Sequence, residues 1–262
     1  PFFTEVARGV EDAASKRDYA VFLCNSDESR VKEDRYINVL MEQQVRGVLI
    51  TPADTHADRL DALRERGISV TLLDREMKGQ MQCSVSVDDV NGGQIAIEYL
   101  ASLGHKYIAW VCGPESIPQV GDRSAGVAKA AKVASVEIET VRVPLMNTVQ
   151  GEEAGRVILE LGQRPTAIFC ANDLLALGVM RTLTSQKIKI PEQISVLGYD
   201  NIEFASSAGI PLSSIAQPSY QMGITAANLL LDECEAGEDH RHQQIRFQPQ
   251  LVERASTATA PK

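Results

Sequence analysis

The sequence has few aromatic residues, an excess of negative over positive charge and no long apolar run. A membrane-spanning helix needs about 20 consecutive apolar residues, and no run approaches that length, so a soluble protein is expected. The 26 Lys and Arg are outnumbered by 35 Asp and Glu, for a formal charge of -9. Because affinity for a nucleic-acid backbone comes mainly from clustered positive charge, this chain is not expected to hold DNA by itself.

Disulfide and metal motifs are also missing. The five cysteines form no C-x-x-C pair, and an odd number cannot all pair within one chain, which favours a reducing cytoplasm. Cys24, Cys112 and Cys170 each end an apolar run and are predicted to be buried thiols. His240 and His242 form an H-x-H in the polar run GEDHRHQQ. With no third ligand or neighbouring cysteine in the run, a solvated turn is predicted there in preference to a metal site.

The usual signatures of nucleotide-binding and hydrolytic enzymes do not occur. No strand is followed by G-x-G-x-x-G, and neither G-x-x-x-x-G-K-S/T nor G-x-S-x-G is found. His56 and His105 have no Ser or Cys in a motif that would use them as a base. We therefore predict no catalytic residue, no metal and no cofactor.

Short apolar runs alternate with segments of helical period. The runs lack polar alternation and are typical of strands buried on both faces: residues 20–24, 47–51, 70–73, 107–112, 167–170 and 195–199. This alternation predicts parallel sheets covered by helices, and six or more strands over this length fit two sheets better than one. Gly104, in LGHK, ends a helix just before a strand and is interpreted as the first boundary between two lobes.

Polar residues lie where strands of the second lobe end. Asn172 follows the run 167–170, Asp200 follows 195–199, and a long polar loop leads to Arg123. Ligands of open α/β sheets bind at the carboxyl ends of the strands, so these three are predicted to converge on one binding edge. Asp173 is predicted only to cap the next helix. Turn chemistry explains a single Asn or Asp here equally well, and a surface ion pair is the competing explanation for the arginine.

Seven blocks, in order along nearly the whole chain, carry a resemblance to a known family. They read PFFTEVARGVEDAA, LLDRE, VDDVNGGQIAIEYLASLGHKYIAWVCGP, DRSAG, PTAIFCANDLLALGVMRTL, IPEQISVLGYDNIEFASSAGIPLSSIAQPSYQMG and LVERAST. Together they resemble the effector-binding core of the LacI/GalR (lactose-repressor) family of bacterial transcription regulators.

This resemblance implies a periplasmic-binding-protein type I fold, with two flavodoxin-like, doubly wound lobes joined by three crossovers near Gly104, Gln217 and Asp239. The N-terminal lobe would comprise residues 1–103 plus 217–238, and the C-terminal lobe residues 104–216 plus 239–262.

The resemblance also implies a homodimer that controls operator DNA in response to a small effector held between the lobes. No helix-turn-helix headpiece precedes Pro1, so DNA contact is expected only through a headpiece outside this chain. The family's first strand is not among these residues either, and we expect the first sheet to be incomplete.

Ligand contacts follow from the resemblance position by position. The polar clamp of the second lobe would be Arg123, Asn172 and Asp200, in agreement with the strand-end argument. The first lobe's side of the cleft would carry Phe2, Phe3 and Asn91, although most aromatic residues are core.

Three further positions depart from the family pattern. Gln150 stands where several relatives have an aromatic that stacks on the ligand, and Ile117 and Gln119 stand where they have polar residues. We include Gln119 and Gln150 among the predicted ligand-binding residues. The effector is expected to be small and polar, sugar-like or nucleobase-like.

Two rival functions remain. An exported periplasmic sugar-binding protein of a transport system shares the fold and the cleft, but the odd cysteine count and the blocks IPEQISVLGYDN and LVERAST favour the regulator. An enzyme on a doubly wound fold is the third hypothesis, and no residue pair proposes a reaction for it.

Overall fold

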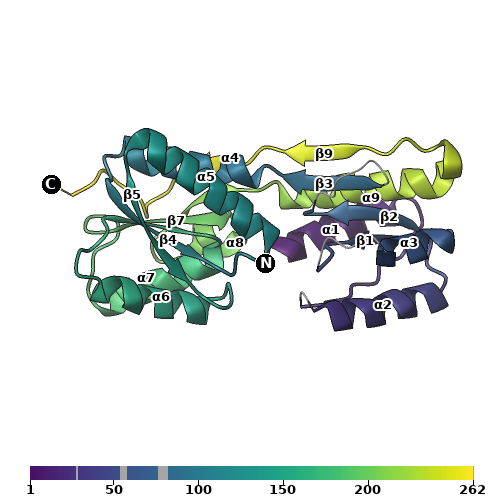
Figure 1. Ribbon diagram of the computed structural model, residues 1–262, viewed down its shortest axis with the longest axis horizontal. Helices are drawn as coiled ribbons and strands as arrows, with labels where there is room; N and C mark the ends of the chain where they lie inside the picture. The colour runs from purple at the N-terminus through teal and green to yellow at the C-terminus, as the bar shows by residue number, and fades with distance from the viewer. Residues whose placement is uncertain (28, 54–57, 76–81, 262) are drawn as a thin grey trace. The chain divides into compact units, whose positions relative to one another are not determined.

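The protein is described by a computed structural model that covers residues 1–27, 29–53, 58–75 and 82–261 (Figure 1). The chain forms two compact units. Unit 1 comprises Pro1–Val87 and Pro218–Phe247, and unit 2 comprises Asp88–Gln217 and Gln248–Lys262. The chain therefore passes from one unit to the other three times.

Two of the three crossovers differ clearly from their predicted positions, and the third division, after Gln217, lies one residue beyond the predicted one. Helix α4 (Asp89–Ser102), predicted for the N-terminal lobe, belongs to unit 2 because it packs along α5 (Pro118–Ala134). Strand β9 (Gln244–Phe247), predicted for the C-terminal lobe, belongs to unit 1 because it pairs with β3 (Cys83–Val87).

Unit 1 is a parallel sheet with a separate apolar core on each face. Its strand order is β1-β2-β3-β9, with β1 at Gly47–Ile50 and β2 at Ser69–Leu73. On one face, α1 (Phe2–Ser15) and α9 (Ser219–Ala236) pack together against the sheet; on the other lie α2 (Arg30–Glu42) and α3 (Asp58–Glu65) (Figure 1). Successive side chains of a strand alternate between faces, so Leu72 belongs to the α2–α3 core and Leu73 to the α1–α9 core.

The predicted strand at residues 20–24 is wrong. The segment forms no strand, and Phe22 and Leu23 are 78% and 81% exposed. Cys24, predicted to be buried, is exposed as well, whereas Cys112 and Cys170 are buried as predicted. A strand is held by hydrogen bonds to a neighbouring strand, and in the described part of the chain this segment pairs with none, so apolar composition alone does not make it one.

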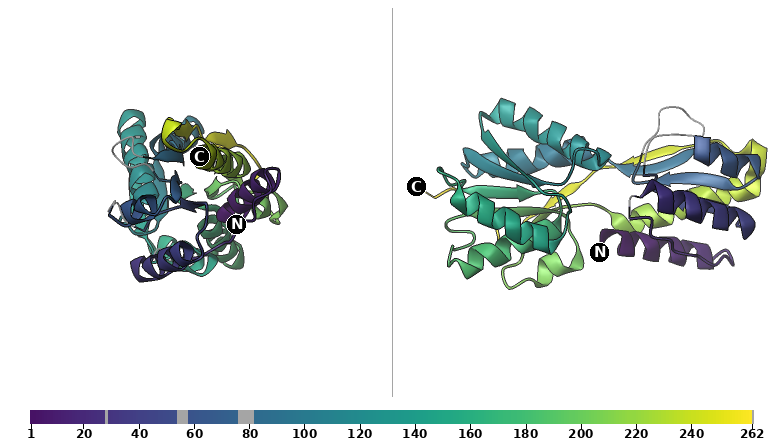
Figure 2. Two further views of the ribbon diagram at one scale, coloured as in Figure 1. Left: turned by 90° about the vertical axis from the view of Figure 1, so that its right-hand side faces the viewer. Right: turned by 60° about the horizontal axis from the view of Figure 1, so that its bottom comes forward.

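Unit 2 is built on a six-stranded sheet of order β10-β8-β7-β6-β4-β5. These strands are β4 (Tyr107–Cys112), β5 (Glu137–Arg142), β6 (Ala167–Cys170), β7 (Ser195–Asp200), β8 (Ser213–Ala216) and β10 (Gln250–Val252). All pairs are parallel except β10 with β8. Helices α4 and α5 cover one face, and α6 (Thr148–Glu160) and α7 (Asp173–Ser185) cover the other (Figures 1 and 2); the short α8 (Glu203–Ser207) follows β7.

An aromatic row crosses the centre of this sheet. Trp110 of β4 stacks on Phe169 of β6 with ring centroids 4.6 Å apart, and Phe169 lies 6.5 Å from Tyr199 of β7. All three side chains are buried. These ring contacts hold Tyr199 in place next to Asp200, the last residue of β7.

The α4–α5 pair packs closely because each helix offers a glycine to the other. A Cβ on Gly93 would lie 2.2 Å from the Arg123 carbonyl oxygen, and one on Gly126 would lie 2.0 Å from the Val90 carbonyl oxygen. Any side chain there would force the helices apart. This contact sets how far α5, and with it Arg123, stands from the start of α4.

None of the helices in the described ranges combines the length and the apolar composition needed to cross a membrane.

Candidate functional site

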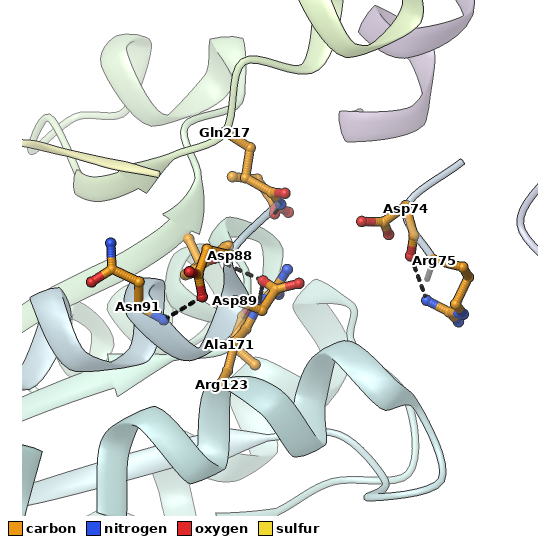
Figure 3. Close-up of polar contacts among 10 residues, drawn as sticks. Asp74, Arg75, Asp88, Asp89, Asn91, Arg123, Ala171 and Gln217 are labelled. Atoms are coloured by element: carbon orange, nitrogen blue, oxygen red, sulfur yellow. Dashed lines mark hydrogen bonds and ion pairs between the residues drawn. The ribbon is translucent and has the colours of Figure 1, made fainter. Parts of the chain in front are cut away.

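Arg123 is buried at the carboxyl edge of the unit 2 sheet. It is 5% exposed, its Nε donates to Oδ1 of Asp89 at 2.7 Å, and its Nη1 donates to the Ala171 carbonyl oxygen at 2.6 Å. Figure 3 shows it reaching from α5 to these partners. Among the described residues no hydrogen bond reaches its Nη2. The surface ion pair considered from the sequence is therefore excluded, and the two N–H donors of Nη2 have no hydrogen-bond partner among the described residues.

Tyr199 and Asp89 hold this arginine from two sides. The guanidinium carbon lies 3.7 Å from the centroid of the Tyr199 ring, within the range of a cation–π contact. The Tyr199 hydroxyl donates to the same Asp89 Oδ1 at 2.8 Å. Burying an ion pair is costly unless its hydrogen bonds are satisfied. Here the hydrogen bond from Nε to Asp89 and the contact with the Tyr199 ring hold the guanidinium in one orientation.

Asp200 ends β7 in an unusual backbone conformation. Its φ is 99°, in the region that side-chain-bearing residues rarely adopt. Its Oδ1 accepts a hydrogen bond of 2.7 Å from Nε2 of Gln217, and among the described residues none reaches its Oδ2. Burial raises the pKa of Asp200 to about 6, against the opposing effects of Arg123 and the Gln217 hydrogen bond.

Gln217 contributes a third hydrogen-bonding group without a partner among the described residues. The side chain is 6% exposed, and Oε1 finds no hydrogen-bond partner within the described part of the chain. An unpaired buried carbonyl oxygen costs about 1–3 kcal/mol unless water or a ligand pairs with it.

The turn that follows Asp200 is pinned in place. The backbone amide of Asn201 donates to Ser214 Oγ at 3.0 Å, and Arg254 Nη2 donates to the Asn201 side-chain oxygen at 2.7 Å. The Ile202 amide donates to Oδ2 of Asp173 at 2.8 Å. A strained residue of this kind costs about 1–3 kcal/mol and persists only when its surroundings hold it, which is typical of functional sites.

The structure places the cap of α7 at Asn172 and not at Asp173, where it was predicted. Asn172 is the N-cap of α7: its side-chain oxygen accepts from the Leu175 amide at 2.9 Å, and its Nδ2 donates to the Met146 carbonyl at 3.1 Å. Asp173 is not the cap. It is fully buried, and its two oxygens accept from Ser214 Oγ and the Ile202 amide.

Asp173 is the most strongly perturbed carboxyl group at this edge. Burial and the charge of Asp200 raise its pKa to about 8, despite the hydrogen bonds from Ser214 and Ile202. Gly198 makes room for it, because a Cβ there would lie 2.0 Å from Oδ1 of Asp173.

The remaining predicted residues are spread over both units. Asn91 lies in unit 2 and not in the first lobe, because α4 belongs to unit 2; its Nδ2 donates to Oε1 of Gln248 at 2.9 Å. Gln119 is buried in the first turn of α5, and Gln150 is partly buried in the first turn of α6. Phe2 and Phe3 lie in the first turn of α1 in unit 1, in edge-to-face contact at 5.1 Å.

Sequence reasoning missed several polar residues at strand ends. Asp89 and Tyr199 were inside recognised segments, but nothing in the pattern linked them to Arg123. In unit 1, Asp74 follows β2 with φ of 55°, and Nη1 of Arg75 donates to its carbonyl oxygen at 3.0 Å (Figure 3). An acidic residue immediately after an apolar run, as in LLDRE, is the signal that could have identified it.

Other hollows of unit 2 lie away from these strand ends. One of about 1030 Å³ is lined by residues of α6 and α7, including Glu152, Arg156 and Arg181. These charged side chains are half or more exposed except for Glu152, and they pair with one another. We place the candidate site at the strand ends because the unspent, buried hydrogen-bonding atoms are there.

Known proteins show the family to which this chain belongs. The sequence matches the periplasmic binding protein-like domain over residues 97–257. It is 32% identical over 98% of its length, and 78% of the relative's, to the HTH-type transcriptional repressor PurR of Vibrio atlanticus. It belongs to the LacI/GalR family. The HTH-type repressor CytR of Escherichia coli is similar to this LacI/GalR chain as well, at 29% identity over its whole length and 77% of the relative's.

Solved structures of LacI-family regulators share the fold. The regulator from Enterococcus faecium with bound ribose is 30% identical and has a TM-score of 0.91, covering 99% of this chain and 95% of that one. A regulator from Enterococcus faecalis, also with bound ribose, is 30% identical with a TM-score of 0.89 over 99% and 95% of the two chains. The two parallel sheets are those of a periplasmic-binding-protein type I fold, and this LacI/GalR chain is the effector-binding core of a transcriptional regulator. Its relatives are repressors and not enzymes, and they favour this function over an exported transport protein.

Proposed function

We propose that the effector of this regulator is a sugar or a sugar derivative and that it binds at the carboxyl ends of β6 and β7 in unit 2. One observation carries the proposal: the unspent Nη2 of Arg123 and Oδ2 of Asp200 offer a donor and an acceptor at one sheet edge. Sugar hydroxyls need both, since each can donate and accept. Bound ribose in two regulators 30% identical to this chain favours a pentose.

The mechanism rests on how firmly these groups are held. Asp89 and Tyr199 fix the guanidinium of Arg123 before the ligand arrives, so little side-chain entropy is lost on binding. The unpaired Oε1 of Gln217 gains a partner if a ligand hydroxyl reaches it. Phe2, Phe3, Asn91, Gln119, Gln150 and Asn172 remain predicted contacts.

Regulation follows from linkage. A ligand shifts an equilibrium between two states only by its difference in affinity for them. In this proposal the chain acts as a cytoplasmic homodimer, the effector favours one of its states, and operator DNA is bound through helix-turn-helix headpieces. Sedimentation of the chain at micromolar concentration tests the homodimer: a dimer is expected, and a monomer would contradict it.

A thermal-shift screen tests the ligand class, since a ligand that binds only the folded state raises Tm. The panel holds pentoses, hexoses, sugar phosphates, nucleosides and free nucleobases. A pentose or a pentose-containing compound is expected to raise Tm in proportion to the logarithm of its concentration. Stabilisation by free nucleobases alone would refute the sugar assignment.

A further inference from the structure

Unit 1 contains a cluster of metal-binding side chains that the strand-edge site does not use. One candidate ligand atom from each of four residues lies within 4.8 Å of the other three. The four residues are Cys83, Glu233, His240 and His242. The sequence offered only the H-x-H pair, because the thiol and the carboxylate come from distant segments.

The fold brings these segments together through β-pairing. Cys83 is the first residue of β3, and the two histidines lie just ahead of β9, which runs parallel to β3 (Figure 1). The Ser84 amide donates to the Gln243 carbonyl oxygen at 2.9 Å, which sets the start of the ladder. Glu233 lies near the end of α9, one turn before the chain bends back through the 3-10 turn Gly237–Asp239.

The spacing suits a tetrahedral metal ion. Sγ of Cys83 lies 3.1 Å from Nε2 of His240 and 4.0 Å from Nδ1 of His242, which in turn lies 3.8 Å from Oε2 of Glu233. With bonds of about 2.0–2.3 Å, the ligands of a tetrahedral Zn²⁺ stand about 3.3–3.6 Å apart. Small side-chain rotations would therefore complete the site.

The carboxylate of Glu233 is left without a hydrogen bond on the side facing the cluster. It accepts a hydrogen bond from the Val70 amide, yet its buried Oε2 has no hydrogen-bond partner within the described part of the chain. A thiol beside two imidazoles and an unpaired carboxylate oxygen is the donor set of a borderline-soft cation. One thiolate and one carboxylate also balance the charge of Zn²⁺, which suits a site with a fully buried cysteine.

We propose that Cys83, Glu233, His240 and His242 bind one Zn²⁺ ion in unit 1. The Cys83 thiol loses its proton to solvent as the S–Zn bond forms, and both imidazoles bind as neutral ligands. The ion joins β3, the end of α9 and the segment leading into β9, so it stabilises unit 1 locally. This inference is independent of the sugar proposal.

The test is a metal titration of the chelator-treated, reduced 262-residue chain. Zn²⁺ is added against a chromophoric chelator to measure stoichiometry and affinity, and Co²⁺ is added to report geometry through its visible absorption and its thiolate charge-transfer band. The variants are Cys83→Ser, Glu233→Gln and His242→Gln, with Cys24→Ser and Glu235→Gln as matched controls at exposed positions. His242 is itself exposed, so its variant keeps the test valid if Cys83→Ser fails to fold.

One equivalent of Zn²⁺, a tetrahedral Co²⁺ spectrum with a thiolate band, and a rise in Tm are expected. His242→Gln should weaken binding by about 10- to 100-fold or more, Cys83→Ser should remove the thiolate band, and both controls should bind like wild type. Two results would overturn the proposal: a folded chain that binds no Zn²⁺ at micromolar concentration, or binding that His242→Gln and Glu233→Gln leave unchanged.

Discussion

At the residue scale, the candidate site is defined by the buried hydrogen-bonding atoms that have no partner among the described residues. The sequence located Arg123 and Asp200 correctly at one sheet edge, because strand ends can be recognised from apolar runs. It placed the cap of α7 at Asp173, although either Asn172 or Asp173 could cap that helix. The structure decides this through the Leu175 amide, which donates to Asn172, and through the burial of Asp173.

Effector affinity should depend on pH through Asp200. The ionised carboxylate of Asp200 is a stronger acceptor for a sugar hydroxyl than the protonated carboxyl group. Burial raises the pKa of Asp200 to about 6. The association constant is therefore expected to be flat above about pH 6 and to fall by up to tenfold per unit below it. Calorimetric titrations across this range measure the effect, and a profile unchanged in Asp200→Asn would assign it to another group.

Stability should depend on pH through Asp173. Because its folded pKa is raised from 3.8 to about 8, the folded state binds more protons than the unfolded state between these values. The free energy of unfolding therefore falls as pH rises through this window, by an amount on the order of a few kcal/mol. Asp173→Asn removes the titrating group and serves as the reference. Urea unfolding measures the free energy of unfolding of both proteins, and the wild-type value minus the variant value should decrease between about pH 5 and pH 8. A constant difference would show that the carboxylate is ionised throughout.

At the element scale, apolar runs predicted the strands of apolar composition and missed strands of mixed composition, including β3 and β8 inside the sheets. The bounds of β4 and β6 agree with the predicted runs 107–112 and 167–170. The strands β3, β5 and β8 were not predicted, since CSVSV, EIETVR and SSIA mix polar and apolar residues. The run 20–24 shows the opposite error: it is apolar enough for a strand, but it pairs with no strand among the described residues.

The close contact between α4 and α5 predicts opposite effects for two glycines of α5. Gly126→Ala puts a methyl group 2.0 Å from the Val90 carbonyl oxygen, and it should lower the free energy of unfolding by about 1–3 kcal/mol. In Gly121→Ala the atom nearest to the new methyl group is 3.9 Å away. The higher helix propensity of alanine should therefore raise the free energy of unfolding by about 0.5–1 kcal/mol.

Chemical denaturation of the two variants measures both changes. Equal effects would mean that helix propensity decides both sites and that the helices can separate without cost.

At the scale of the whole molecule, each unit has its own apolar cores. The single tryptophan, Trp110, is buried in unit 2, so its fluorescence reports that unit, while far-UV circular dichroism reports both. We expect the urea transition seen by circular dichroism to be broader than the fluorescence transition, since separate cores need not unfold together. Coincident transitions would show one cooperative structure.

The crossovers explain why the sequence misplaced the unit boundaries. Gly104 ends a helix clearly, and a helix end is easily taken for a domain end. The actual division at Val87–Asp88 falls between β3 and α4 without a glycine or proline to mark it. The packing of α4 on α5 and on the unit 2 sheet shows that this helix belongs to unit 2.

The central claim is that a sugar-bearing effector binds at the strand edge formed by Arg123 and Asp200. Isothermal titration of the best compound from the screen into wild type, Asp200→Asn and Asp122→Asn tests it most directly. Asp122 is exposed on α5 beside Arg123 and serves as the matched control. We expect Asp200→Asn to weaken binding at least about tenfold, because a charge-assisted hydrogen bond contributes about 1.5–3 kcal/mol, and Asp122→Asn to bind like wild type. Wild-type affinity in a folded Asp200→Asn would contradict the account.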